Sequence, residues 1–113
     1  MFIVEQQIEK SNLCSYCKIK MEDNLIKGVV DLGSERIALD AAMHVDLESM
    51  LLNAGAVQSD LWGFNLYPDE EGEDFIEFDS MINLRPWDNN RSRGVDDVNI
   101  QNEIIEVINK WIK

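Results

Sequence analysis

Two pairs of strand-like segments, each joined by a short turn, most constrain what this chain can fold into. The first pair covers residues 25–32 and 36–43, where β-branched and apolar residues flank a Gly33-Ser34 turn. The second pair covers residues 60–68 and 75–85, which flank the acidic turn DEEGED. Because short connections join only antiparallel neighbours, the sequence predicts a mainly antiparallel sheet.

Helical patterns alternate with these hairpins, and a short strand is expected at residues 2–7. Three segments have the apolar spacing of an amphipathic helix. They are residues 11–23 with Ser11 as N-cap, residues 46–55 with Asp46 as N-cap, and residues 97–112 with Asp96 or Asp97 as N-cap. The last of them has one apolar face, formed by Ile100, Ile104, Val107, Ile108 and Trp111.

The resulting order, β-α-β-β-α-β-β-α, predicts an α+β fold. A chain of 113 residues is expected to form one domain over residues 1–113. We expect a mainly antiparallel sheet of about five strands with the helices on one face. The first six elements also follow the order of a ferredoxin-like unit.

Alternation along the strands predicts a polar face on the side of the sheet away from the helices. Side chains in a strand point alternately to the two faces, so each strand contributes polar residues to one of them. The residues expected there are Asp40, His44, Asn65, Tyr67, Asp79, Asn83 and Arg85. This face is either an ordinary solvated surface of an antiparallel sheet or the floor of a binding site.

The charge of the chain excludes several classes of function. A formal net charge of -12 argues against binding to nucleic acids or anionic membranes, because both require a positive surface. No apolar run is long enough for a membrane span, and the N-terminus has no signal-peptide pattern. We therefore expect a soluble cytoplasmic protein, with a basic protein as one possible partner.

The cysteines and the acidic turn do not predict a cofactor or a metal. Cys14 and Cys17 form a C-x-x-C pair inside a predicted helix, which favours two small buried apolar residues over a redox site. A zinc site would need both cysteines, the single histidine and a carboxylate, and no spacing supports that set. The acidic turn lacks the ligand register of an EF-hand.

His44 is the only histidine and the candidate general base. It stands near the end of a predicted strand, where it could act as a general base. A structural histidine is the alternative, because a base needs a positioned partner. Ser80 and Ser92 are the candidate nucleophiles, and neither lies in a G-x-S-x-G turn.

The segment RPWDNNRSRG, residues 85–94, contains three of the four arginines of the chain. Arginine recognises carboxylates and phosphates through paired hydrogen bonds, and the following helix N-terminus favours anions. The residues expected to bind an anionic ligand are Asp79, Asn83, Arg85, Asn90, Arg91, Ser92 and Arg93. Alternatively, Asp79, Asp96 and Asp97 hold the arginines internally, and the sequence does not decide between the two.

Residues 60–97 resemble a family of small prokaryotic proteins catalogued as a domain of unknown function. The resemblance rests on DLWGFNLYP, on EFDSMINLRP and on NRSRGVDD, with weaker similarity at VVD and around His44. It implies no activity. It implies that residues 83, 85 and 90–94 belong to a shared motif, together with His44 and Asp46, and that the C-x-x-C pair lies outside it.

The sequence is therefore compatible with three functions. The first is a binding module for an anionic ligand, with Arg85, Arg91 and Arg93 as the anion-binding groups. The second is an interaction module, an antitoxin-like acidic partner of a basic protein, in which the acidic turn makes the contacts and homo-oligomers are possible. The third is a small hydrolase or transferase that uses His44 as general base and arginines as anion stabilisers.

Overall fold

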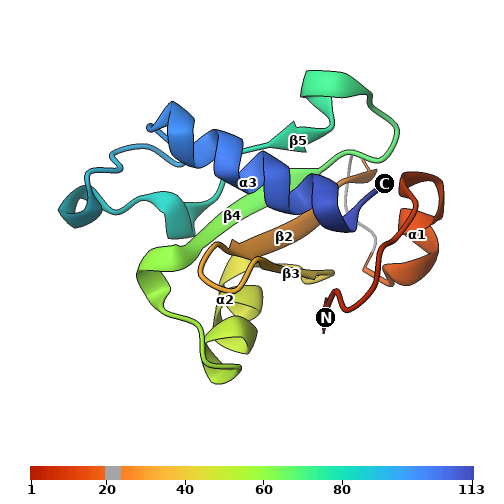
Figure 1. The fold of residues 1–113 in the computed structure, drawn as a ribbon, viewed down its shortest axis with the longest axis horizontal. Helices are drawn as coiled ribbons and strands as arrows, with labels where there is room; N and C mark the ends of the chain where they lie inside the picture. Colours follow the sequence, from red (N-terminus) through yellow and green to blue (C-terminus); the bar gives the residue numbers. More distant parts are fainter. Residues whose placement is uncertain (20–23) are drawn as a thin grey trace.

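A five-stranded sheet forms the centre of the molecule. The structure, a computed structural model, describes residues 1–19 and 24–113. The strand order is β1-β3-β2-β4-β5, and each neighbouring pair is antiparallel (Figure 1). The strands are β1 (Phe2–Ile3), β2 (Ile26–Asp31), β3 (Arg36–Leu39), β4 (Leu61–Leu66) and β5 (Ile76–Glu77). The predicted α+β class and the antiparallel five-stranded sheet are confirmed.

The ferredoxin-like expectation is wrong. A βαβ unit places its two strands parallel and needs a crossover of a dozen or more residues, usually a helix. Here β1 pairs antiparallel with β3 at one edge of the sheet, and no pair of described strands is parallel. The α-helix described between β1 and β2, α1 (Leu13–Tyr16), has only four residues and cannot supply such a crossover.

The two longer helices pack on opposite faces of the sheet, whereas the sequence predicted one face. In Figure 1, α3 (Val98–Trp111) lies in front of the sheet and α2 (His44–Asn53) lies behind it. The reason lies in the central strands, which are apolar on both sides: Val29 packs with the α2 residues Leu47 and Leu51, while Val30 packs with Ile104 and Ile108 of α3. All six residues of β4 are buried.

Only the first part of the predicted N-terminal helix forms, and the helix ends at Tyr16. A 3-10 turn (Lys10–Asn12) and α1 are formed, and Cys17 is already extended. The buried Asp40 carboxylate accepts hydrogen bonds from the backbone N–H groups of Lys18 and Ile19, at 3.0 and 2.9 Å, which holds the segment after α1. The end of the predicted helix, residues 20–23, lies outside the described residues.

The ends of the other two helices differ in how well they were predicted. Of the two predicted N-caps, Asp97 caps α3, because its carboxylate accepts a hydrogen bond from the Asn99 N–H at 2.8 Å. The second helix begins two residues earlier than predicted, at His44, with Met43 rather than Asp46 in the N-cap position. Gly55, just beyond its C-terminal end, has a φ of 99°, which suits glycine.

The second hairpin is much shorter than predicted. Residues 75–85 were expected to form one long strand, but β5 ends at Glu77 and a 3-10 turn (Met81–Asn83) follows. The alternation predicted for this segment is therefore lost, and Asn83 and Arg85 are buried rather than exposed on a polar face.

Candidate functional site

Asn83 takes the place of a strand residue beside β4. The β4–β5 ladder covers only Asn65 and Leu66, so the edge of β4 around Gly63 has no strand partner there. The Asn83 side chain fills that position: its Oδ1 accepts from the Gly63 N–H at 2.8 Å and its Nδ2 donates to the Gly63 carbonyl at 3.0 Å. The side chain is fully buried, so its carboxamide serves the fold.

Asn90 organises the segment that follows. Its Nδ2 donates to the carbonyls of Asn83, Ser92 and Gly94, and its Oδ1 accepts from the Asp96 N–H at 2.8 Å. Its backbone pairs with that of Arg85 in both directions, at 2.8 and 3.0 Å. Asn90 is therefore committed to the loop and is not available to a ligand while the loop keeps this conformation.

Arg85 is buried against Trp62 instead of lying on a polar surface. Its guanidinium carbon is 4.2 Å from the Trp62 ring centroid, and its Nη1 donates to the Gln58 carbonyl at 2.8 Å. Asp88 lies 3.9 Å from its Nε, and burial lowers the pKa of the guanidinium from its ordinary value. Arg85 thus connects the loop to the start of β4, through the cation–π contact with Trp62 and the hydrogen bond to the Gln58 carbonyl.

The two exposed arginines of the loop have different surroundings. Arg93 Nε lies 2.8 Å from Asp79 Oδ1, so this arginine is paired within the protein. The Arg91 guanidinium has no hydrogen bond or ion pair with any described residue. Asp96 accepts from the Arg91 backbone N–H and the Ser92 hydroxyl, and these hydrogen bonds lower the pKa of the Asp96 carboxyl.

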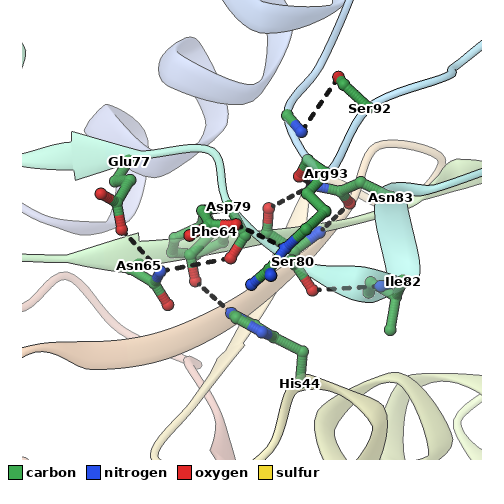
Figure 2. A network of polar contacts seen from close by, with 12 residues as sticks. His44, Phe64, Asn65, Glu77, Asp79, Ser80, Ile82, Asn83, Ser92 and Arg93 are labelled. Atoms are coloured by element: carbon green, nitrogen blue, oxygen red, sulfur yellow. Dashed lines mark hydrogen bonds and ion pairs between the residues drawn. The ribbon is translucent and has the colours of Figure 1, made fainter.

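A pocket of about 240 Å³ lies where the loop meets the N-terminus of α2. Its polar lining residues are Lys27, His44, Asp79, Ser80 and Arg93. Its apolar lining residues are Ala42, Met43, Val45, Met81 and Ile82. Figure 2 shows Asp79, Ser80 and Arg93 gathered above His44 at the edge of the sheet. We refer to this hollow as the His44 pocket.

The structure brings together three of the eight predicted site residues. His44, Asp79 and Arg93 line the pocket. Asn83, Arg85 and Asn90 are buried in the loop and its contacts, while Arg91 and Ser92 do not line the pocket. Asn65 is buried beside Glu77 and Asp79, and its Nδ2 donates to the Glu77 carboxylate at 2.9 Å (Figure 2).

His44 is held in one tautomer. Its Nε2 lies 2.8 Å from the Phe64 carbonyl oxygen, which can only accept, so the proton is on Nε2 and the neutral ring keeps a lone pair on Nδ1. Burial lowers the pKa of His44 from its ordinary 6.5; Lys27 also lowers it, and the Phe64 carbonyl, Asn65 and Asp79 oppose the shift. At neutral pH the pocket therefore contains an uncharged imidazole.

We expect the buried neutral His44 to make stability depend on pH. Between the two pKa values the unfolded chain binds the proton and the folded protein does not, so the free energy of unfolding falls as pH drops below about 6.5. His44→Gln keeps a donor for the Phe64 carbonyl but does not titrate, so this component should disappear. Urea unfolding at several pH values between 7.5 and 5 measures it; parallel curves for both proteins would contradict the assignment.

The cysteines are not the buried apolar pair that the sequence predicted. Cys14 is exposed and Cys17 is half-buried. Burial, together with the negative charge of Asp40, raises the pKa of the Cys17 thiol to about 12, so it stays protonated at neutral pH. No group of three or more metal-binding side chains occurs in residues 1–19 and 24–113.

The sequence prediction missed Lys27 and the apolar rim of the pocket. Lys27 is paired in register with Asn65, so the correct β2–β4 register would have placed it on the same face of the sheet. Met43, Val45 and Met81 gave no such signal, because they are separate exposed residues that come together only in the fold.

One comparison with known proteins identifies a family, and none gives an activity. No helix in the described part of the chain is both long and apolar enough to cross a membrane. Searches of curated proteins and of solved structures found no match. The model of one family, described as protein of unknown function (DUF5674), matches residues 2–111. The chain therefore belongs to the DUF5674 family of proteins of unknown function.

Proposed function

We propose that the protein binds a small organic anion in the His44 pocket. The observation that carries the proposal is that Lys27 and Arg93 line one hollow together with the first residues of α2. The N-terminus of a ten-residue helix presents backbone N–H groups and a partial positive charge. Two cations and a helix N-terminus are a suitable setting for a carboxylate or phosphate.

The pairing of Arg93 with Asp79 shapes how an anion would bind. Asp79 engages only the Nε side of the guanidinium, at 2.8 Å, and Arg93 is 56% exposed. An anion that takes the remaining donors of Arg93 competes with Asp79 for the same charge. The excess of carboxylates elsewhere, with a net charge of -12, repels anions from the rest of the surface.

The rim of the pocket favours an anion that carries an apolar group. Met43, Val45 and Met81 are 60%, 45% and 62% exposed around the polar floor. Methionine side chains are flexible and adapt to differently shaped apolar ligands. A short carboxylic acid or organic phosphate could thus place its charge near Arg93 and its apolar part against the rim.

The test is a nuclear magnetic resonance titration with acetate, butyrate, hexanoate and inorganic phosphate. We expect shifts at the amides of His44 and Val45, and affinity that rises by about threefold per added methylene group. Arg93→Gln should weaken butyrate binding by about tenfold, since a charge-assisted hydrogen bond is lost. Asp79→Asn should strengthen it by roughly fivefold, because a competing charge is removed.

Arg91→Gln is the matched control, with the same change in charge at an arginine two residues away that does not line the pocket. It should leave the affinity unchanged. Equal weakening by the Arg91 and Arg93 substitutions, or shifts scattered over the whole surface, would refute the proposed site.

A second candidate function is supported by one observation. His44 is neutral, is fixed through Nε2 and lines the same pocket as Ser80, as a general base beside a hydroxyl nucleophile would. Hydrolysis of p-nitrophenyl butyrate tests it. Activity that is lost in both His44→Gln and Ser80→Ala would support a hydrolase or transferase, and activity that survives both substitutions would exclude this pair.

A further inference from the structure

A groove runs between β5 and α3 on the face of the sheet opposite the His44 pocket. It has a volume of about 740 Å³. Its sheet side is lined by Gly72, Glu73, Phe75, Ile76 and Phe78, and its helix side by Gln101, Asn102, Ile105 and Asn109, with Lys10 at one end. In Figure 1, β5 forms one edge of the sheet, and α3 crosses in front of the sheet next to β5.

The outer edge of β5 is open at Ile76, and the backbone of Arg93 and Gly94 lies beside the residues that follow. The Ser80 N–H donates to the Arg93 carbonyl at 2.9 Å, and a Cβ on Gly94 would lie 3.3 Å from the Phe78 carbonyl oxygen. The strand pairs with β4 on one side and has no neighbour on the other among the described strands. Tyr67 N–H donates to the Phe75 carbonyl, so Phe75 and Glu77 face β4 and the backbone groups of Ile76 and Phe78 point outward. Neither Ile76 nor Phe78 has an outward backbone hydrogen bond to a described residue.

The groove has the composition of a peptide-binding cleft. The side chains of Ile76, Phe78 and Ile105 are half-buried and leave part of their apolar surface accessible. Asn102 and Asn109 are exposed on α3 and offer amide donors and acceptors. An open strand edge beside a helix provides backbone hydrogen bonds for affinity and a side-chain pocket for specificity.

The charge around the groove selects for a basic partner. Glu73 lines it, and it belongs to the acidic turn DEEGED, residues 69–74, that enters β5. The one cation at the groove, Lys10, is occupied: its ammonium lies 4.5 Å from the Phe75 ring centroid and 3.5 Å from the Glu71 carboxylate. A second copy of this chain, with its own charge of -12, would be repelled.

We propose that this groove binds an extended, basic segment of a partner protein, which adds to the open edge of β5 as a sixth strand. Alternate side chains of the segment enter the groove over Ile76, Phe78 and Ile105, since strand side chains alternate between faces. The other side chains, lysine or arginine, lie toward the acidic turn. This inference does not rest on the proposed anion site, which uses the other face of the sheet.

The probe is a short fluorescent peptide of alternating lysine and valine, measured by fluorescence anisotropy with the full chain. We expect binding that weakens as salt is added, and no binding of the equivalent glutamate–valine peptide. Asn109→Lys places a positive charge in the groove and should weaken binding by roughly fivefold. Asn53→Lys makes the same change at an exposed asparagine of α2, on the opposite face, and should leave binding unchanged.

A backbone test separates strand addition from simple charge attraction. A lysine–valine peptide that is N-methylated at alternate residues keeps its charge but loses the backbone donors of one edge. It should not bind. Equal binding of the methylated peptide, equal weakening by Asn53→Lys and Asn109→Lys, or a dimer that forms through β5 in place of peptide binding would each overturn the proposal.

Discussion

Asn83→Ala is expected to lower the free energy of unfolding by roughly 3–5 kcal/mol, because two buried backbone groups lose their partner at once and the partly buried Arg93 carbonyl keeps only the Ser80 N–H as donor. The Gly63 N–H and carbonyl have the Asn83 carboxamide as their partner, and the Arg93 carbonyl also accepts from its Nδ2 at 3.0 Å. A domain of this size is stable by only about 5–15 kcal/mol, so the loss is a large fraction of the total.

Chemical unfolding followed by tryptophan fluorescence measures this loss. Asn53→Ala is the control, since Asn53 is exposed on α2 and has no side-chain hydrogen bond to a described residue. It should change the free energy of unfolding by no more than about 0.5 kcal/mol. If Asn83→Ala also costs less than about 1 kcal/mol, the carboxamide does not serve as the edge partner of β4.

Gly63→Ala is expected to destabilise the protein by about 1–3 kcal/mol through overpacking at the same edge. A Cβ at this position would lie 2.5 Å from both Cβ and Oγ of Ser80 and 3.2 Å from Cγ1 of Ile82. The 3-10 turn that follows Ser80 can approach β4 closely enough for Asn83 to pair with it only because residue 63 has no side chain.

A double-mutant cycle with Ser80→Gly tests that cause. Removing the Ser80 side chain takes away the two atoms that the new Cβ would meet at 2.5 Å, so the double variant should be more stable than the sum of the two single effects predicts. Strictly additive effects, measured by the same unfolding experiment, would show that Ser80 is not what limits residue 63.

Elements with strong local patterns were predictable from the sequence. The last helix was predicted correctly, with Asp97 as its cap and Ile104, Val107 and Ile108 buried, because a period near 3.6 over fourteen residues and a capping carboxylate agree. The pairing of the first hairpin was predicted for a similar reason, since two apolar runs flank a Gly-Ser turn, although its second strand ends at Leu39 and not at residue 43. Sequence patterns within a single element are therefore enough to predict it when the periodicity and the capping or turn residues all lie inside that element.

The site depends on long-range contacts that leave no local pattern. The sequence placed Asn83 and Arg85 on a polar strand face, but β5 ends at Glu77 and both side chains turn inward, one to Gly63 and the other to Trp62. Alternation assumes a continuous strand, and the assumption failed where a 3-10 turn replaced it. Three of the predicted residues, His44, Asp79 and Arg93, do line one pocket, because α2 begins at His44 beside the segment that contains Asp79 and Arg93.

Residues 76–80, which form β5 and its continuation, contribute to two surfaces. Ile76 and Phe78 line the groove against α3, and the next two residues, Asp79 and Ser80, line the His44 pocket on the other face. A ligand that binds on one face and fixes this backbone would already have removed part of its conformational entropy. A second ligand on the other face would then lose less entropy when it binds. Occupancy of one surface would then change affinity at the other, and linkage requires the effect to be equal in both directions. The binding of a small anion and the binding of a protein partner would in this way be coupled through residues 76–80, a short edge strand and its continuation.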